Sequence, residues 1–266
     1  MSGPLDGLGA VVTGALGRLG PVWCEALLDA GARVVAIDLP GAAASPAFGD
    51  LARRAGERLR SMPASVLDRP SLTAVRDRCA RDGLVLSILV NNAGIDQPPG
   101  PAKTYRIEDV PLDVFRGTVD VNLTGAFLAS QVFGSAMAAA GRGSIVNIGS
   151  LYASVSPDAR FYDHLEADPP FLKPPAYGAS KAALVNLTRY LATHWAPRGV
   201  RVNALSPGGV EGGQDAEFKR KFVARVPLGR MAEPRDLTGP LIFLASDASA
   251  YVTGVELRVD GGFTAW

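Results

Sequence analysis

Short apolar runs alternate with longer amphipathic runs along almost the whole chain. The apolar runs predict strands at 8–12, 33–38, 62–67, 84–90, 143–150, 200–205 and 254–259. The patterns between them predict helices at 21–30, 70–81, 112–139, 177–188 and 234–246, with a loop and an exposed helix between 41 and 61. Because strands that alternate with helices form parallel sheets, we predict an α/β fold with a doubly wound parallel sheet and helices on both faces.

One predicted helix is interrupted. The pattern at 112–139 changes near 121–125, where Asn122 stands among valine, leucine, threonine and glycine. A short polar side chain competes for backbone hydrogen bonds, so we expect Asn122 to bend the helix.

Length and charge narrow the class of partner. A chain of 266 residues suits one large α/β domain, spanning 1–266, better than two ordinary domains. Its 27 basic and 26 acidic side chains nearly balance, which gives no electrostatic reason to expect nucleic acid or an anionic membrane. We therefore expect a small-molecule ligand.

The cysteines and the N-terminus indicate a reduced, intracellular protein. Cys24 and Cys79 lie far apart, and neither has the spacing of a zinc site or redox dithiol, so we interpret both as packing residues and expect no metal. The N-terminus lacks a basic region followed by an apolar one, and no apolar run approaches about 18 residues. We expect a soluble, cytoplasmic protein.

A glycine-rich turn joins the first predicted strand to the first predicted helix. It reads Thr13-Gly14-Ala15-Leu16-Gly17-Arg18-Leu19-Gly20. Glycines let a backbone approach a pyrophosphate, and the start of the following helix carries partial positive charge. The order of strand, turn and helix therefore indicates a dinucleotide phosphate site, and a tight connection without a ligand is the alternative.

The second predicted strand ends in a carboxylate, Asp38, which lies 18 positions after Gly20. At about 20 residues from such a turn, an acidic group meets the adenosine ribose hydroxyls. Asp38 would repel a 2′-phosphate and Leu39 offers it no cation, so we predict NAD rather than NADP. Two alternatives are a polar residue that merely caps the strand and an Arg18 side chain that reaches the 2′-phosphate.

Two further strands end in small or polar residues. The fourth runs into Asn91-Asn92-Ala93-Gly94, and the fifth delivers Ser150. The carboxyl ends of parallel strands meet at one edge of a sheet, where amides and small residues can line a ligand crevice. A plain turn and a simple serine cap are the alternatives.

Tyr177 and Lys181 are four residues apart at the start of a helix rich in alanine and leucine. Such a pair lies on one helix face, so the hydroxyl and the ammonium can converge. A tyrosine titrates near about 10, and a neighbouring cation favours the phenolate and lowers that pKa. The pair predicts acid/base chemistry, with an amphipathic surface pair as the alternative.

Taken in order, these pieces resemble the short-chain dehydrogenase/reductase family across essentially the whole chain. The matching elements are the glycine turn, Asn91-Asn92-Ala93-Gly94, Asn122, Ser150, Tyr177 with Lys181, Pro207-Gly208 and Asp260-Gly261-Gly262. The resemblance implies a Rossmann-type sheet of about seven strands that binds a nicotinamide dinucleotide along its carboxyl edge. Most members are homotetramers, and the apolar side chains that fit either such an interface or ordinary core packing are Leu184, Leu187, Leu191 and Trp195.

The resemblance also implies roles for individual residues. Tyr177 would exchange a proton with the substrate oxygen, and Ser150 would hydrogen-bond that oxygen. Lys181 would hold the nicotinamide ribose and lower the Tyr177 pKa, while Asn122 would position a water that leads from Lys181 to solvent. The expected cofactor-binding residues are Gly14, Gly17, Arg18, Leu19, Gly20, Asp38, Val66, Asn92, Ala93, Gly94, Tyr177, Lys181, Pro207, Gly208 and Val210.

The chain departs from the family pattern at four positions in the cofactor half. Arg18 stands where the family usually has glycine, and Gly17 gives a spacing closer to the longer-chain branch that acts on nucleotide sugars. We nevertheless expect a member of the single-domain branch, without the extra C-terminal substrate domain of the longer one. Ser65 replaces the aspartate that commonly meets the adenine amino group. Gly212 replaces the threonine that commonly meets the carboxamide.

The loop at 151–176 separates Ser150 from Tyr177 and is longer than usual in the family by about a dozen residues, a length that is usually functional when ordered. Because both ends adjoin the predicted catalytic residues, we expect this loop to form one wall of the substrate pocket under a lid at 208–225. The rings expected to face a sugar are Tyr152, Phe161 and Tyr162, and the expected donors are Arg160, His164 and Lys173. Four acids, Asp158, Asp163, Glu166 and Asp168, argue against requiring an anionic substrate. A surface insertion or subunit contact is the alternative.

The loop and the C-terminal sequence resemble gluconate 5-dehydrogenase-like and surface-polysaccharide sugar-modifying members of the family. We predict an NAD(H)-dependent enzyme that interconverts a secondary alcohol and a ketone on a hydroxylated, sugar-like substrate. The alternatives are a 3-oxoacyl-thioester reductase and, in a different class, a non-catalytic dinucleotide-binding protein.

Overall fold

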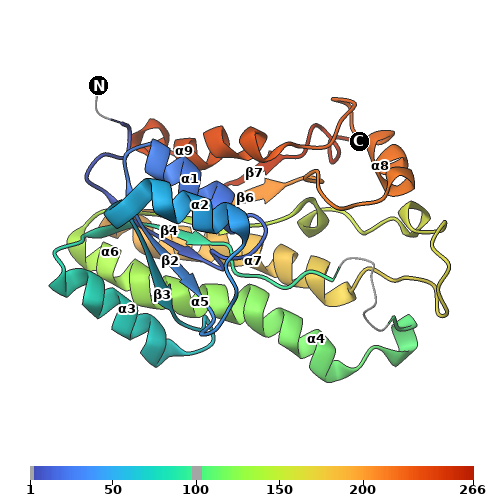
Figure 1. Cartoon of the computed structure of the whole chain (residues 1–266), viewed down its shortest axis with the longest axis horizontal. Coiled ribbons are helices and arrows are strands. Elements are labelled where there is room, and N and C mark those ends of the chain that lie inside the picture. The colour runs from blue at the N-terminus through green and yellow to red at the C-terminus, as the bar shows by residue number, and fades with distance from the viewer. Residues whose placement is uncertain (1–2, 98–103) are drawn as a thin grey trace.

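The computed structural model describes residues 3–97 and 104–266, and a parallel sheet of seven strands forms its centre (Figure 1). The strands are β1 (Gly9–Thr13), β2 (Arg33–Asp38), β3 (Leu59–Pro63), β4 (Leu86–Asn91), β5 (Gly143–Ile148), β6 (Val200–Pro207) and β7 (Glu256–Val259). Their order is β3-β2-β1-β4-β5-β6-β7, with every neighbouring pair parallel. The predicted α/β class and doubly wound sheet are confirmed.

Helices cover both faces of the sheet (Figure 1). One layer contains α1 (Gly20–Asp29), α2 (Pro46–Ala55) and α9 (Thr238–Ala245), which pack on one apolar core. The other layer contains α3 (Arg69–Arg81), α4 (Leu112–Val119), α5 (Ala126–Ala129), α6 (Ser135–Ala140) and α7 (Pro175–Trp195), whose core includes Leu191 and Trp195. These two residues, with Leu184, are buried within the subunit, so core packing explains them.

The interrupted helix is continuous from Leu112 to Ala140, with π-helical turns at Asp120–Gly125 and Ser130–Gly134. The side chain of Asn122 bonds to the backbone of Ile95, not to its own helix, so the expected mechanism of bending was wrong. Among the described residues this helix alone has the length and composition to cross a membrane, but half of its most apolar window is buried inside the protein. Burial of that kind is typical of a core helix.

The third strand begins earlier than predicted. It spans Leu59–Pro63 instead of 62–67, because its register pairs Val34 with Leu59 and Asp38 with Pro63. Proline has no backbone N–H, so it is tolerated at the end of this edge strand but not in its middle.

A third apolar cluster lies beyond the carboxyl edge of the sheet. We call it the lid cluster, and it consists of Leu151, Phe161, Tyr162, Phe171, Phe218, Phe222, Val226, Met231 and Phe263. Its members come from the long loop after β5, from α8 (Ala216–Val223), from the segment after α8 and from the C-terminal segment. Aromatic packing therefore joins the loop at 151–176 to α8, within the predicted lid at 208–225.

Candidate active site

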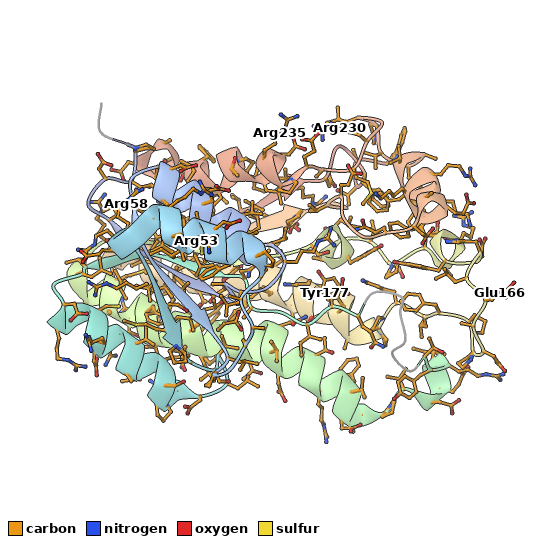
Figure 2. All side chains as sticks on the ribbon, viewed as in Figure 1. Arg53, Arg58, Glu166, Tyr177, Arg230 and Arg235 are labelled. Atoms are coloured by element: carbon orange, nitrogen blue, oxygen red, sulfur yellow. The ribbon has the colours of Figure 1, made fainter. Side chains whose placement is uncertain are left out.

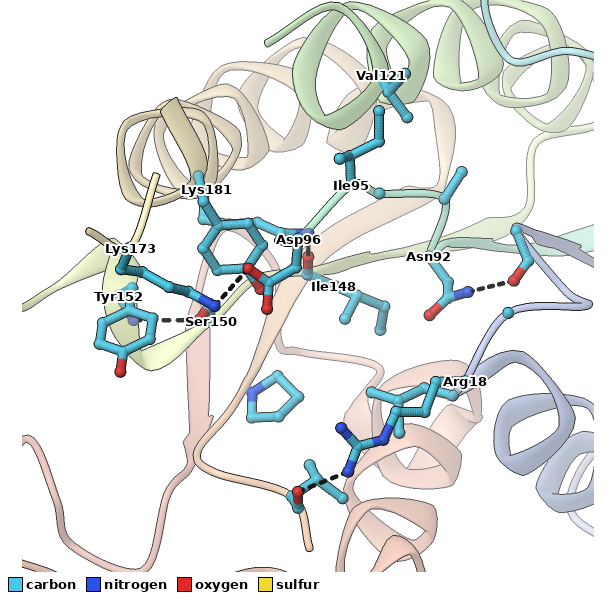
Figure 3. A pocket seen from close by; sticks show the side chains of 18 of the residues that line it. Arg18, Asn92, Ile95, Asp96, Val121, Ile148, Ser150, Tyr152, Lys173 and Lys181 are labelled. Carbon is cyan, nitrogen blue, oxygen red and sulfur yellow. Dashed lines mark hydrogen bonds and ion pairs between the residues drawn. The ribbon is translucent and has the colours of Figure 1, made fainter. Parts of the chain in front are cut away.

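A cavity of about 1310 Å³ runs along the carboxyl ends of the strands. Its walls come from the glycine turn after β1, the ends of β2, β4, β5 and β6, the start of α7, the long loop and α8. Figure 3 shows Arg18 and Asn92 toward one end and Ser150, Tyr152 and Lys173 toward the other. The volume exceeds that of an ordinary small-molecule pocket and leaves room for a dinucleotide beside a substrate.

The glycine turn is shaped by close backbone contacts. Gly14 has a φ of +61°, and a Cβ there would lie 2.6 Å from Cα of Ala93. A Cβ on Gly20, where α1 begins, would lie 2.1 Å from the carbonyl oxygen of Ala15. Only glycine fits these two positions, and the turn presents the start of α1 to the cavity as a phosphate site requires.

Asp38 lies at the end of β2 and lines the same half of the cavity. Its Oδ2 accepts a hydrogen bond from the N–H of Leu16, and its Oδ1 accepts one from the N–H of Leu39, each at 2.8 Å. A carboxylate oxygen has more than one lone pair, so both can still accept ribose hydroxyls. The two backbone bonds fix the carboxylate in place.

Arg18 lines the cavity but its guanidinium is engaged within the protein. Nη2 donates to the carbonyl oxygens of Val210 and Glu211, both at 2.9 Å. The side chain therefore ties the glycine turn to the segment after β6. An Arg18 that reaches for a 2′-phosphate is not the conformation observed.

The side-chain amides of Asn91, the last residue of β4, and of Asn92 make hydrogen bonds within the protein. Asn92 accepts a hydrogen bond from Trp23 Nε1 at 2.7 Å and donates to the carbonyls of Thr13 and Gly14, at 3.0 and 2.8 Å. Asn91 is buried and faces the helices under the sheet. Asn92, Ala93 and Gly94 line the cavity, whereas Asn91 does not.

Most of the other expected cofactor residues lie along the same wall. Gly17, Leu19, Val66, Pro207, Gly208 and Val210 line the cavity, as does Ser65, whereas Gly20 is buried and does not line it. A Cβ on Gly208 would lie 2.7 Å from Cα of Asp260, so Pro207-Gly208 packs directly against the start of Asp260-Gly261-Gly262.

Ser150, Tyr177 and Lys181 meet at the substrate end. Ser150 Oγ accepts from the N–H of Tyr152 at 3.2 Å and forms a hydrogen bond with Tyr177. Lys181 Nζ donates to the carbonyl of Ile148 at 2.7 Å and lies 5.8 Å from the centroid of the Tyr177 ring. These three side chains line one face of the cavity.

Asn122 lies behind that face. Its Oδ1 accepts from the N–H of Ile95 at 2.6 Å, and its Nδ2 donates to the Ile95 carbonyl at 3.1 Å and to Ser180 Oγ at 3.0 Å. The side chain is buried and clamps the segment after β4 to α7.

The pKa of Tyr177 is shifted in the direction opposite to the one expected from the sequence. Burial raises the pKa of Tyr177, and the nearby carboxylate of Asp96 raises it further, while the hydrogen bond with Ser150 lowers it. Burial lowers the pKa of Lys181 to about 8, against the opposing effect of Asp96. The expectation that Lys181 brings the Tyr177 pKa below its ordinary value is therefore wrong for this structure, because the cost of burying the phenolate dominates.

The loop at 151–176 contributes a wall to the cavity, but with fewer of its side chains than expected. Tyr152, Tyr162 and Lys173 line it. Phe161 instead packs inside the lid cluster, and Arg160 is exposed and paired with Asp158. Figure 2 shows Glu166, a further lining residue, at the outer end of the loop, away from Tyr177.

His164 also turns away from the cavity. Its Nε2 lies 2.8 Å from Asp215 Oδ1, at the start of α8, and its Nδ1 lies 3.4 Å from Lys221 Nζ. The ring therefore links the loop to the lid, and it is not the substrate donor that we expected.

Asp96 is a site residue that sequence reasoning missed. It lines the cavity and forms an ion pair with Lys173 (Figure 3). Its position two residues after the Asn91-Asn92-Ala93-Gly94 motif was the available signal, because that motif already marked the sheet edge.

Comparisons with known proteins agree with this geometry. A family model described as enoyl-(acyl carrier protein) reductase matches residues 14–264. The chain is 37% identical to galactitol 2-dehydrogenase (L-tagatose-forming) of Cereibacter sphaeroides, over 98% of this chain and 97% of that protein.

Solved structures show the same likeness. A short-chain dehydrogenase from Leptospira borgpetersenii with bound NAD+ matches with a TM-score of 0.84 and 32% identity, covering 98% of this chain and 94% of that chain. A gluconate 5-dehydrogenase from Burkholderia cenocepacia in complex with NADP and tartrate matches with a TM-score of 0.83 and 31% identity, covering 98% and 97%.

Proposed function

The chain belongs to the short-chain dehydrogenase/reductase family, and from this premise we propose that it is an NAD-dependent dehydrogenase of a polyhydroxylated, sugar-like secondary alcohol. As a member of that family it is an oxidoreductase. One observation carries the proposal: Ser150, Tyr177 and Lys181 meet at one end of a cavity whose other end holds Asp38. A protein that only binds a dinucleotide does not require Ser150, Tyr177 and Lys181 to meet in this way.

The chain's own residues supply proton transfer. In alcohol oxidation the Tyr177 phenolate accepts the proton of the substrate hydroxyl, and Ser150 donates a hydrogen bond to the same oxygen. Lys181 carries its positive charge below a pKa of about 8, and its Nζ lies 5.8 Å from the centroid of the Tyr177 ring. Bound NAD supplies the hydride acceptor.

The residues of the other end fit NAD. The glycine turn and the start of α1 would hold the pyrophosphate, and Asp38 would accept the adenosine ribose hydroxyls. A 2′-phosphate would lie beside the Asp38 carboxylate, and Arg18 is engaged with two backbone carbonyls. These contacts support NAD over NADP, although the family includes proteins bound to either.

The substrate proposal rests on the cavity wall and on the relatives. Tyr152 and Tyr162 offer ring faces and polar tips, and Lys173 and Asp96 offer a donor and acceptors. Two of the relatives described above are a galactitol 2-dehydrogenase and a gluconate 5-dehydrogenase. We propose that the loop at 151–176 and the lid at 208–225 enclose this substrate.

A turnover assay tests the function. Purified protein is incubated with NAD+ or NADP+ and a panel of hexitols, tetritols, aldonates, simple secondary alcohols and a 3-hydroxyacyl thioester. We expect kcat/KM to be highest for a polyol with NAD+. If the 3-hydroxyacyl thioester is the best substrate, the protein is a 3-oxoacyl-thioester reductase instead. If the protein binds NAD+ but turns over none of these compounds, it is a non-catalytic dinucleotide-binding protein.

We also propose that the enzyme is a cytoplasmic homotetramer. Family members are mostly tetramers, and Phe127 on α5 and Tyr190 on α7 leave apolar ring surface exposed on the subunit. Light scattering coupled to size exclusion tests the assembly, and a monomer at micromolar concentration contradicts it.

A further inference from the structure

Lys173 is a buried cation on the substrate side of the cavity. Its side chain is 7% exposed, and its Nζ lies 2.5 Å from Oδ1 of Asp96 (Figure 3). The same Nζ lies 5.1 Å from the ring centroid of Tyr177 and 5.9 Å from that of Tyr152. A buried ammonium is costly unless it is paired, so Asp96 explains how Lys173 is tolerated. It does not explain why a charged pair is placed against the reacting tyrosine.

Both members of the pair are held by restrained backbone. Lys173 is followed by two prolines, which restrict it to extended conformations, and α7 begins at Pro175. Asp96 follows Ile95, whose N–H and carbonyl are both bonded to the side chain of Asn122. Polar groups held in this way bind a ligand without a large ordering cost.

The charges around the pair disfavour an anionic substrate. Among the described residues that line the cavity, Arg18 and Lys181 donate to backbone carbonyls, and Lys173 is paired. Glu166, farther out on the same loop, adds a negative charge to the cavity lining. A substrate carboxylate would therefore lie beside Asp96, whereas a neutral hydroxyl can accept from the ammonium and donate to the carboxylate at once.

Resting on the proposed dehydrogenase function, we propose that the Lys173–Asp96 pair recognises the hydroxyl group next to the reacting carbon, and that the substrate is a neutral vicinal diol and not a sugar acid. The reacting oxygen lies at Tyr177 and Ser150. A vicinal diol carries its second hydroxyl on the adjacent carbon, within reach of a cation packed against the same ring. The pair thus sets substrate choice, while Tyr177 carries the chemistry.

Kinetics with butane-2,3-diol and butan-2-ol test this assignment, since the two alcohols share a carbon skeleton and differ by one hydroxyl. With NAD+ the wild type is expected to favour the diol in kcat/KM by at least about tenfold, because a site built to bind a hydroxyl rejects the analogue that lacks it. Lys173→Met and Asp96→Asn are each expected to bring that ratio to within about threefold of one.

Two control variants separate recognition from a structural role. Lys173→Arg keeps a donor and should retain most of the preference for the diol. Arg160→Met makes a matched change on the same loop, at an exposed cation paired with Asp158, and should leave the ratio unchanged. A ratio that stays at the wild-type value in folded Asp96→Asn or Lys173→Met overturns the assignment.

A second measurement tests the charge of the substrate. Asp96→Asn leaves Lys173 unpaired, so kcat/KM for D-gluconate relative to D-glucitol is expected to rise at least about fivefold. A wild type that prefers D-gluconate, or an Asp96→Asn variant that does not raise this ratio, overturns the choice of a neutral diol. If the wild type turns over no alcohol with either cofactor, the proposed function fails instead, which is a different result from an altered ratio.

Discussion

The guanidinium of Arg18 lies directly against Gly212, so that a Cβ at position 212 would fall 2.0 Å from Nη2. Both residues depart from the usual family pattern, which has glycine at the first position and threonine at the second. In the structure the two departures meet: the arginine occupies the space that a threonine side chain would need. The Arg18 side chain thereby joins the glycine turn to the first part of the lid at 208–225.

A double-mutant cycle tests this coupling. Arg18→Ala removes the two hydrogen bonds to Val210 and Glu211, and Gly212→Thr displaces the same guanidinium. Each is expected to destabilise the segment after β6 by about 1 kcal/mol and to raise KM for NAD+. The double variant should be no worse than either single one, because both remove the same contacts. Additive losses in thermal stability and KM contradict the coupling.

Cofactor preference is expected to depend on Asp38. We expect the wild type to prefer NAD+ over NADP+ in kcat/KM, and Asp38→Ala to narrow the preference by at least about tenfold, since each 1.4 kcal/mol of lost repulsion and lost ribose contact is a factor of about ten. Asp50→Ala, an exposed acid on α2, serves as the control. A wild type that prefers NADP+ rules out the proposed role of Asp38.

Tyr177→Phe removes only the proton-transferring hydroxyl. We expect kcat to fall by about 10² to 10⁴, as is typical for a lost general acid or base. NAD+ affinity, measured by fluorescence titration, should stay within about threefold of the wild-type value, whereas Lys181→Ala should impair both. If Tyr177→Phe turns over at a near wild-type rate, another group carries the proton.

The pH dependence of alcohol oxidation should shift in opposite directions in two variants. Burial and then Asp96 raise the pKa of Tyr177 above the ordinary tyrosine value of about 10, so the phenolate that accepts the proton forms only in the alkaline range. Asp96→Asn removes a negative charge, lowers that pKa and moves the rising limb to lower pH. Lys173→Met leaves Asp96 without its cation and moves the limb to higher pH. Profiles of kcat/KM from about pH 8 to about pH 12 decide this, and shifts in the same direction contradict it.

The lid cluster is expected to depend on Phe161. Its ring centroid lies 5.6 Å from that of Phe222 and 6.0 Å from that of Phe218. Phe161→Ala should cost about 3 to 5 kcal/mol of local stability, loosen α8 and raise KM for the alcohol. Phe161→Leu keeps most of the volume and should be much milder. Hydrogen exchange in α8 measures the effect, and unchanged exchange in Phe161→Ala would show that α8 is held by other contacts.

The sequence by itself determined the sheet, the order of its elements and the family. The spacing of apolar residues predicts strands and helices from local sequence alone. The motifs around Gly14 and Ser150 directly follow predicted strands, and the motif around Tyr177 lies at the start of a predicted helix. Their carboxyl-edge placement follows from parallel topology alone. The predicted fold is confirmed, and the family prediction is confirmed by a family model that covers residues 14–264.

Only the tertiary structure decided where the side chains of the irregular segments point. Phe161 turned into the lid cluster and Lys173 into the cavity, although they lie on the same loop. The ion pair of Lys173 with Asp96 and the contact of Arg18 with Gly212 join residues far apart in the chain. No local period controls such directions, because outside regular structure a side chain is oriented by whatever distant segment packs against it. The burial that raises the Tyr177 pKa has the same origin, since it is a property of the assembled cavity and not of the helix that carries the tyrosine.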